Sequence, residues 1–357
     1  MERQPLIGKT FTELKQVVQA LQLPAFTANQ LSEWLYKRQV RDFDEMTNIS
    51  LKNRELLSRH YCVGIYPPEK TTISKDGTKK YLFASPNFSK GEEHSPLLEK
   101  GVGGEVETVY IPDDDRHTLC VSVQAGCKMN CLFCATGKLG FERQLSAHEI
   151  INQIVAVPEA KLLTNIVFMG MGEPMDNLTE TLAVLEILTE DYGFAWSPKR
   201  ITVSTIGLLP AMTQFIEKSK CHLAVSMHTP FSNERLKLMP VEKACSLEAV
   251  LAELRKHDFS HQRRLSFEYI LFDGFNDTLK HARETLRLLK GIDCRMNLIR
   301  FHAIHGVDLN PSPMEKIMIF RDYLNENGVS TTIRKSRGED ILAACGMLAA
   351  QKNTIKD

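Results

Sequence analysis

From about residue 105 the sequence repeats one pattern, in which short β-rich runs alternate with loops and with segments of helical periodicity. The strand-like runs are ETVYIP, TLCVSVQ, NIVFMG, RITVSTIG, CHLAVSMH, RLSFEYILF, MNLIRFH and STTIRK. Segments such as SAHEIINQIVAV, LTETLAVLEILTE and TLKHARETLRLLK separate most of them and carry apolar residues at helical spacing. This alternation predicts βα units around a parallel sheet. The expected fold class is α/β, a partial or complete TIM-type barrel with its active site at the carboxyl ends of the strands.

The N-terminal part of the chain predicts a different kind of structure. Residues 1–65 contain three segments with helical periodicity, FTELKQVVQALQ, ANQLSEWLYKRQ and LKNRELLSRHY. We expect them to form a small helical accessory domain.

The region between these two parts, residues 66–112, predicts a hairpin followed by a linker. Two β-rich runs flank Asp76 and Gly77, a typical hairpin turn. Residues 85–104 are rich in Gly, Ser, Pro and charged residues, which indicates an inserted loop and a domain boundary nearby. The barrel is then expected over residues 113–350.

Composition restricts the classes of protein that remain. The chain is 43% hydrophobic and 25% charged, which is ordinary for a globular protein. No apolar run approaches the roughly 18 residues of a membrane span, and MERQPLIGKT lacks the apolar core of a signal peptide. We therefore expect a cytoplasmic protein without a membrane partner. In a reducing compartment its nine cysteines predict metal ligands or catalytic thiols rather than a disulfide framework.

The densest cysteine group lies in GCKMNCLFCATG and consists of Cys127, Cys131 and Cys134. A structural zinc site needs four ligands, and no second Cys or His pair with finger spacing follows. A redox dithiol needs only one CxxC pair, so it leaves Cys127 unexplained. The third interpretation is an iron–sulfur cluster held by three thiolates, with the fourth iron open to a ligand. The CxxxCxxC spacing is that of radical S-adenosylmethionine (SAM) enzymes, and it favours this interpretation over ordinary buried cysteines.

Small and polar residues at other strand ends predict a ligand pocket beside this cysteine group. Gly170 and Gly172 in FMGMGEP let a ligand approach the backbone, and Glu173 offers a carboxylate to an ammonium group. Further polar side chains at strand ends are Ser204, Ser226 and His228. Each alone fits a strand-end cap equally well, but their common position favours a pocket.

A second group of reactive residue types lies near the other end, in RKSRGEDILAACGML. Arg334, Lys335 and Arg337 form a compact basic group that could contact RNA phosphates or could be a solvated turn. Cys345 follows, and without further information a free cysteine is usually a small buried hydrophobe. The same default applies to four cysteines with no chemistry nearby, Cys62, Cys221, Cys245 and Cys294.

Several motifs together resemble the RlmN family of radical SAM RNA methyltransferases, whose close relative is Cfr. The motifs are CVSVQAGCKMNCLFCATG, FMGMGEPMDN, STIGLLP, SMHTPFSNERLKLMP and RKSRGEDILAACG. The resemblance extends from the N-terminal helices to about residue 350. It implies a radical SAM barrel, a [4Fe–4S] cluster on Cys127, Cys131 and Cys134, and SAM as the second cofactor.

The resemblance also implies a mechanism with two further thiols. Cys345 matches the cysteine that receives a methyl group from one SAM and passes a radical carbon to the adenine. Cys120 matches the cysteine that resolves the resulting protein–RNA crosslink by forming a disulfide with Cys345. Glu107 matches the general base. From burial statistics alone, Cys120 is an inward strand residue and Glu107 a solvated carboxylate.

The remaining expectations from the resemblance concern cofactor contacts, substrate and partners. Residues expected to contact SAM are Gly172, Glu173, Ser204, Ser226, Met227, His228 and His302. His302 stands in NLIRFH where most relatives have Asn, and Asn297 is a fallback for that contact. The expected product is 2-methyladenosine in 23S rRNA and in tRNA, with a flavodoxin or ferredoxin as electron donor. The alternatives are a Cfr-like carbon-8 methyltransferase and a non-catalytic iron–sulfur RNA-binding protein.

Overall fold

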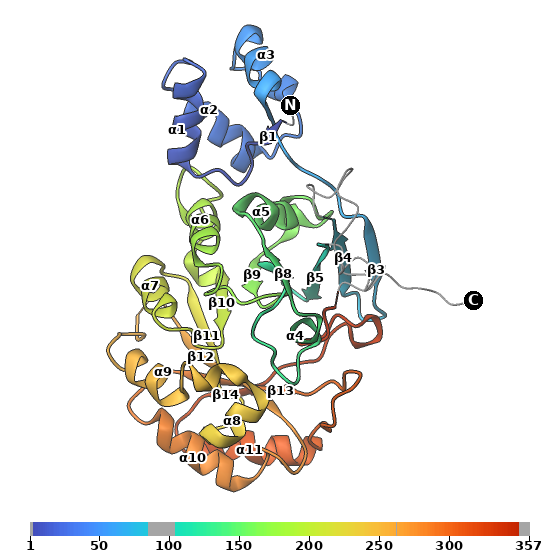
Figure 1. Ribbon diagram of the computed structural model, residues 1–357, viewed down its shortest axis with the longest axis vertical. Coiled ribbons are helices and arrows are strands. Elements are labelled where there is room, and N and C mark those ends of the chain that lie inside the picture. The colour runs from blue at the N-terminus through green and yellow to red at the C-terminus, as the bar shows by residue number, and fades with distance from the viewer. Residues whose placement is uncertain (1–2, 85–103, 262, 350–357) are drawn as a thin grey trace, which may run out of the picture.

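A ten-stranded sheet organises the molecule, in the order β14-β13-β12-β11-β10-β9-β6-β5-β4-β3 (Figure 1). The computed structural model describes residues 3–84, 104–261 and 263–349. The strands are β3 (Lys70–Ile73), β4 (Lys79–Phe83), β5 (Val106–Asp113), β6 (Arg116–Cys120), β9 (Asn165–Phe168), β10 (Ile201–Thr205), β11 (His222–Ser226), β12 (Leu265–Leu271), β13 (Arg295–Arg300) and β14 (Thr331–Ile333). From β6 to β14 neighbouring strands are parallel, and from β3 to β6 they are antiparallel. Over the described residues β3 and β14 are the free edges, so the barrel is open.

Helices cover the outside of the parallel strands, as the alternation predicted. They are α5 (Ala147–Val155), α6 (Leu178–Thr189), α7 (Ala211–Lys218), α8 (Ser232–Leu238), α9 (Leu247–Leu254), α10 (Leu279–Leu289) and α11 (Met314–Glu326). Strand β12 is buried along its whole length, which is typical of a parallel strand covered on both faces. The predicted class, an α/β partial barrel, is confirmed.

The N-terminal residues form a separate layer of short helices at the top of Figure 1. Helices α1 (Phe11–Ala20), α2 (Thr27–Ser32) and α3 (Leu51–His60) coincide with the three predicted segments. One difference is that α2 continues as a π-helix over Glu33–Arg38, where a uniform α-helix was expected. Strand β1 (Gln4–Pro5) pairs with β2 (Tyr61–Cys62), which closes this layer on itself.

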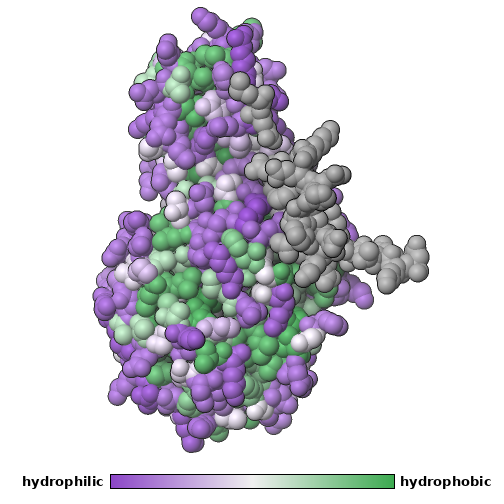
Figure 2. Space-filling view, in the orientation of Figure 1, coloured by the Kyte–Doolittle hydropathy of each residue, from purple (hydrophilic) through white to green (hydrophobic). Residues whose placement is uncertain are grey.

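Aromatic contacts attach the N-terminal layer to the barrel. The Phe11 and Tyr192 rings stack at 5.2 Å, and the Tyr36 and Phe194 ring centroids lie 5.6 Å apart. Figure 2 shows that the N-terminal layer is mainly hydrophilic at its surface, whereas apolar residues are exposed over the middle of the larger body.

The predicted hairpin around Asp76 and Gly77 is present as the antiparallel pair of β3 and β4. Strand β4 then pairs with β5, so the hairpin extends the barrel sheet. Most of the insertion expected at 85–104 lies outside the described residues, and the domain boundaries remain a prediction. None of the described helices has the length and hydrophobicity needed to cross a membrane.

Candidate active site

A cavity of about 520 Å³ opens at the carboxyl ends of the parallel strands, where the barrel predicted the site. Its wall includes residues from β5, β6, β9 to β13 and the segment after β14. The residues predicted from sequence that line it are Cys120, Cys127, Cys131, Cys134, Gly172, Glu173, Ser204, Ser226, His228, His302 and Cys345. The fold therefore brings into one cavity side chains that are up to 225 residues apart in sequence (345 − 120).

The loop with three cysteines begins at the end of a short hairpin, β7 (Gln124–Gly126) with β8 (Phe141–Gln144), and leads into α4 (Ala135–Leu139). The Cys127 amide donates to the Gly140 carbonyl at 2.8 Å, which closes the base of the loop. A Cβ on Gly126 would lie 1.9 Å from the same carbonyl oxygen, so only glycine fits there. The backbone thus fixes where the loop starts and ends.

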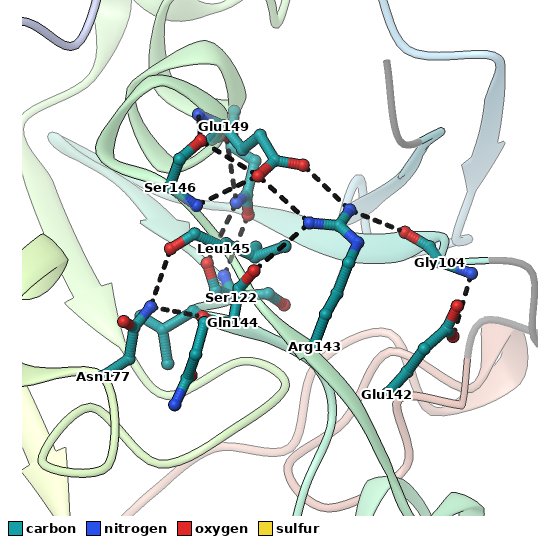
Figure 3. A network of polar contacts seen from close by, with 11 residues as sticks. Gly104, Ser122, Glu142, Arg143, Gln144, Leu145, Ser146, Glu149 and Asn177 are labelled. Carbon is teal, nitrogen blue, oxygen red and sulfur yellow. Dashed lines mark hydrogen bonds and ion pairs between the residues drawn. The ribbon is translucent and has the colours of Figure 1, made fainter. Parts of the chain in front are cut away.

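A polar network anchors this hairpin to α5 (Figure 3). Arg143 pairs with Glu149 at 2.8 Å, and Glu149 also completes the capping box with Ser146 at the start of α5. The Asn177 amide donates to the Val123 and Leu145 carbonyls at 2.9 and 2.8 Å. These bonds hold both strands of the hairpin against the barrel.

The three thiols have the environment that an iron–sulfur cluster needs. Burial raises the pKa of Cys127 to about 12 and also raises the pKa of Cys131 and Cys134. Such thiols are neutral unless a metal ion stabilises the thiolate. Across the described chain no three Cys, His, Asp or Glu side chains converge tightly enough to hold one metal ion. An iron–sulfur cluster would receive each of the three thiolates on a different iron.

Beside the cysteine loop, Gly172 and Glu173 form a fixed turn after β9. Gly172 has φ +97°, and a Cβ there would meet Gln124 at 2.5 Å. The Glu173 carboxylate accepts hydrogen bonds from the Thr205 hydroxyl at 2.6 Å and from the Ile206 amide at 3.0 Å. Burial nevertheless raises the pKa of Glu173 to about 7. A cationic group in the cavity would stabilise its ionised form.

Ser204 and Ser226, near the ends of β10 and β11, also line the cavity, and His228 follows β11. The His228 Nδ1 accepts a hydrogen bond from the Ile270 amide at 3.1 Å, so the neutral ring carries its proton on Nε2. Burial lowers the pKa of His228 to about 3, which keeps the ring neutral. His228 can therefore donate one hydrogen bond to a ligand.

A buried ion pair holds the ends of β10 and β11 in place. Arg235 on α8 is fully buried and pairs with Glu242, and it donates to the Ile206 and Ser226 carbonyls at 2.9 and 3.1 Å. The guanidinium thus joins two strand ends that line the cavity. Sequence reasoning missed this residue, because an arginine within NERLKLMP has no local feature that distinguishes it from a solvated helix residue.

Cys120 and Cys345 lie close enough for the charge of one to affect the other. Burial raises the pKa of Cys120 to about 12, and the neighbouring Cys345 thiolate raises it further. Burial likewise raises the pKa of Cys345, although its side chain is exposed to the open cavity. The Arg334 guanidinium opposes these increases at both thiols. Arg334 itself is held by Glu268, with Nη1 3.3 Å from the carboxylate oxygen.

The segment that carries Cys345 spans the open side of the barrel between the sheet edges. Before the cysteine, the Gly338 amide donates to Asp76 at 3.0 Å, and the Ser74 hydroxyl donates to Asp340 at 2.5 Å. Both partners belong to the turn between β3 and β4. The turn of the predicted hairpin therefore positions the segment that carries Cys345.

After the cysteine, the same segment contacts the cluster loop. The Ala135 amide donates to the Gly346 carbonyl at 2.7 Å, and the Thr136 hydroxyl donates to the Leu348 carbonyl at 2.7 Å. Helix α4 begins directly after Cys134. Helix α4 therefore connects the three-thiol loop to the Cys345 segment.

Two predicted site residues lie away from the main cavity. Met227 is fully buried because strand alternation points it away from Ser226 and His228. Glu107 is also buried but borders a second cavity of about 200 Å³. There it pairs with Lys80 at 2.8 Å and accepts from the Ala349 amide at 2.9 Å, so it is not the solvated carboxylate that burial statistics suggested.

The structure also changes the interpretation of three polar groups. Arg334 belongs to the cavity, and Arg337 pairs with Asp113 at 2.6 Å, so the compact basic group is not a free phosphate-binding turn. The fallback Asn297 is not among the cavity residues and instead donates to Glu268 at 2.8 Å. His302 does line the cavity, where its ring bonds with Ser336 at 3.0 Å and lies 3.2 Å from Glu339.

An open βα barrel with a three-thiol loop at the carboxyl ends of its strands is the architecture of a radical SAM enzyme. The Radical SAM superfamily model matches residues 121–289. A crystal structure of a radical SAM methyltransferase from Sphaerobacter thermophilus superposes with a TM-score of 0.87 at 35% identity, covering 98% of this chain and 100% of that one.

Within that superfamily the chain belongs to the RlmN family of RNA methyltransferases. Residues 4–63 match the ribosomal RNA large subunit methyltransferase N-terminal domain. Relatives named probable dual-specificity RNA methyltransferase RlmN are 56% identical in Phocaeicola vulgatus, over 97% of this chain and 95% of that one, and 55% identical in Bacteroides fragilis, over 99% and 98%. A relative from Halorhodospira halophila is 39% identical over 97% of this chain and 93% of its own length. The chain is thus an RNA methyltransferase that uses SAM and a [4Fe–4S] cluster.

Proposed function

We propose that this enzyme methylates carbon 2 of adenosine in 23S rRNA and in tRNA, with Cys345 as the methyl carrier. The observation that supports this most directly is the arrangement of Cys120 and Cys345, which share one cavity with the three cluster thiols. Carbon 2 of adenine has no lone pair to attack a sulfonium methyl group. A thiol that carries the methyl group and a second thiol that releases the product provide a route that does not require carbon 2 to act as a nucleophile.

The first step is a displacement at Cys345. Its thiolate attacks the methyl carbon of SAM, a new S–C bond forms, and the sulfonium C–S bond breaks to release S-adenosylhomocysteine. Arg334 favours the thiolate form because its charge lowers the pKa of Cys345. Glu268 keeps the guanidinium in place.

Five residues would hold SAM at the strand ends. Glu173 would accept hydrogen bonds from the ammonium group, Ser204 and Ser226 would bond its polar atoms, and His228 would donate from Nε2. Gly172 provides a backbone position that SAM can approach closely. Cys127, Cys131 and Cys134 would hold the iron–sulfur cluster. When bound, the cluster would supply the electron for cleavage of a second SAM, and the resulting radical would remove a hydrogen atom from the Cys345 methyl group.

The remaining chemistry uses this chain's own thiols. The Cys345 methylene radical adds to carbon 2 of adenine, which leaves the enzyme covalently linked to RNA. Once the radical adduct has given up one electron, which the iron–sulfur cluster would take back when bound, and the proton on carbon 2 has been removed, the Cys120 thiolate attacks the Cys345 sulfur. The S–C bond breaks, a Cys120–Cys345 disulfide forms, and the released methylene carbon takes up a proton to become the methyl group.

The same proposal assigns Glu107 as the base that removes the carbon-2 proton. Glu107 is bonded to Ala349, four residues beyond Cys345, and borders a separate cavity in this structure. It would reach the adenine only after the Cys345 segment shifts. An electron donor such as a flavodoxin or ferredoxin and a cytoplasmic location complete the proposal.

Product identification tests this function. The anaerobically reconstituted enzyme is incubated with SAM, reductant and a 23S rRNA fragment or tRNA, and nuclease digests are analysed by mass spectrometry. We expect 2-methyladenosine with the wild type and with Cys221→Ala, a buried thiol away from the site, and none with Cys345→Ala. 8-Methyladenosine would instead identify a Cfr-like activity. Absence of any methylated nucleoside with the wild type would indicate a non-catalytic RNA-binding protein.

A further inference from the structure

Several basic residues gather where the parallel strands begin, at the end of the barrel opposite the cysteine loop. Arg116 starts β6, His222 starts β11, Arg264 directly precedes β12, and Arg295 starts β13. Lys199 lies just before β10. We call these five residues the strand-start cluster. Nothing in the proposed chemistry above uses them.

Three of these residues are exposed at the end of the barrel and share the alternation of residues that face its interior. Arg264 shares a strand face with Glu268 and Ile270, and Arg295 shares one with Ile299. Arg116 shares a face with Thr118 and Cys120. Those interior residues line the main cavity, and Arg116 itself is part of its wall. The cavity therefore extends from the cysteines of the three-thiol loop to Arg116.

Like charges face one another in this cluster. Burial lowers the pKa of Arg264, and the neighbouring Arg295 and Arg116 lower it further. Burial, followed by Arg264, Lys199 and Arg295, lowers the pKa of His222 to about 4. The Arg264 amide donates to His222 Nδ1 at 2.8 Å, which keeps the ring against the arginines.

Among the described residues no carboxylate forms an ion pair with the cations of this cluster. Arg116, Lys199, Arg264 and Arg295 form no ion pair there. Asp113, the nearby carboxylate on the cavity wall, is paired with Arg337. Unpaired cations that repel one another destabilise the free protein, and an anionic ligand would relieve that repulsion.

We infer that the strand-start cluster binds backbone phosphates of the RNA substrate beside the nucleotide that enters the cavity. Planar guanidinium groups match phosphate oxygens in two-point contacts, and three of the four cations in the cluster are arginines. An acidic electron donor is the other class of anionic partner. Such a donor would need to approach the iron–sulfur cluster, whose cysteine ligands lie at the opposite end of the barrel from the strand-start cluster. The inference rests on the proposed RNA methylation.

Charge removal tests the inference. In the triple variant Arg116→Gln, Arg264→Gln, Arg295→Gln we expect at least a tenfold loss of affinity for a synthetic tRNA anticodon stem-loop near physiological salt. Each lost phosphate contact lowers the slope of log affinity against log salt by about 0.7, so the slope should fall by about 2. Fluorescence anisotropy over a salt series measures both quantities.

A matched control removes three exposed cations after the strands instead, with Lys237→Gln, Lys243→Gln and Arg283→Gln. None of the three is in an ion pair in the described part of the chain, and RNA binding by this control should be unchanged. Iron content and melting temperature show whether each variant folds. If a folded strand-start variant keeps the wild-type affinity and slope, the inference is wrong. The inference is also wrong if the strand-start variant keeps wild-type RNA binding and only the reduction of its iron–sulfur cluster by a reduced flavodoxin slows.

Failure of the inference is distinguishable from failure of the proposed function. If the wild type forms 2-methyladenosine and the strand-start variant binds RNA normally, only the location of the phosphate contacts is wrong. If the wild type forms no methylated nucleoside, the proposed function itself fails. In the expected case the variant retains methylation at saturating RNA with an increased KM, because its thiols and the cluster loop are intact.

Discussion

At the scale of single residues, one guanidinium favours the thiolate form of two cysteines. Arg334 lowers the pKa of both Cys120 and Cys345, against the larger effect of burial. The cavity thus holds two cysteines that are unreactive when neutral, and a charge that brings each closer to ionisation. Glu268 and Asn297 position that charge through contacts of 3.3 and 2.8 Å.

The first prediction concerns Arg334. In the double variant Arg334→Met, Glu268→Gln, which removes both partners of the ion pair, the pKa of Cys345 should rise, because Arg334 lowers this pKa more than Glu268 raises it. Methylation of Cys345 near neutral pH should then slow, with the pH profile displaced to higher pH. Mass spectrometry of the protein after incubation with SAM measures the rate. Arg334→Lys should keep most of the wild-type profile, and a profile unchanged in the double variant would contradict the role.

The second prediction concerns Glu173, whose pKa burial raises to about 7. Between about pH 4.5, typical of an exposed Glu, and pH 7, the folded state holds a proton that the unfolded state has lost. The stability of the wild type should therefore fall, relative to Glu173→Gln, as pH rises through that window, by at most about 3 kcal/mol.

Melting temperatures of both proteins from pH 5 to pH 8 check this prediction. The side-chain amide introduced by Glu173→Gln cannot ionise. Its less favourable hydrogen bonds therefore change the melting temperature by an amount that does not depend on pH. Two parallel pH profiles would show that the Glu173 carboxyl does not titrate in this range.

At the scale of elements, the site depends on how loops connect strand ends. Helix α4 connects the three-thiol loop to the Cys345 segment, and the β3–β4 turn holds that segment through Asp76 and Ser74. Arg235 joins the ends of β10 and β11 from inside α8. These contacts set the cavity walls, although none of them belongs to the reacting groups.

The third prediction concerns that buried arginine. Arg235→Met should lower the free energy of unfolding by about 3 to 5 kcal/mol, because it leaves Glu242 as an uncompensated buried charge. The double variant Arg235→Met, Glu242→Gln should recover part of the loss. Thermal unfolding of the reconstituted proteins tests both, and equal melting temperatures for the wild type and Arg235→Met would show that the pair contributes nothing.

The elements themselves were predictable from the sequence to a large extent. Period-2 and period-3.6 patterns identified the strands and the main helices, since burial on one or both faces determines these patterns. The π-helix at Glu33–Arg38 was not predictable, because its apolar spacing resembles that of an α-helix. The order of strands β3 to β6 also required the structure, since hairpin signals fix neighbours but not how a hairpin joins a larger sheet.

The site was only partly predictable. Cysteine spacing indicated the cluster loop, and strand-end positions indicated Glu173, Ser204, Ser226 and His228, all of which line the cavity. The sequence suggested that Arg334 belongs to a basic patch. It does not show that Arg334 faces Glu268, which lies 66 residues earlier in the chain. Met227 is the reverse case, since it stands in a motif with Ser226 and His228 but its side chain is fully buried outside the cavity.

At the scale of the whole molecule, an open barrel combines three functions around one cavity. The side chains that we propose to bind the cofactors lie at the carboxyl ends of the strands, and the Cys345 segment spans the open side between β14 and β3. The strand-start cluster lies at the opposite end. In our inference RNA phosphates are held at this opposite end, while the target nucleotide enters the cavity toward Cys345.

The fourth prediction tests the cofactor end. Anaerobic reconstitution should load about four irons per chain, the content of a [4Fe–4S] cluster. The variant Cys127→Ala, Cys131→Ala, Cys134→Ala should lose them, whereas Cys62→Ala, Cys221→Ala, Cys294→Ala should not. Iron analysis with the visible absorption spectrum provides the readout, and full iron loading of the first variant would contradict the assignment.

The central claim is that Cys345 and Cys120 act in sequence, and Cys120→Ala tests it most directly. This protein should still be methylated on Cys345 and should still cleave SAM. It should then remain covalently attached to RNA, because the thiol that breaks the S–C bond is missing. Denaturing gel electrophoresis of Cys120→Ala purified from cells should show a slower-migrating species that ribonuclease removes and that Cys120→Ala, Cys345→Ala lacks. If Cys120→Ala shows no such species and forms methyladenosine at the wild-type rate, Cys120 is only a packed strand residue and the two-thiol account is wrong.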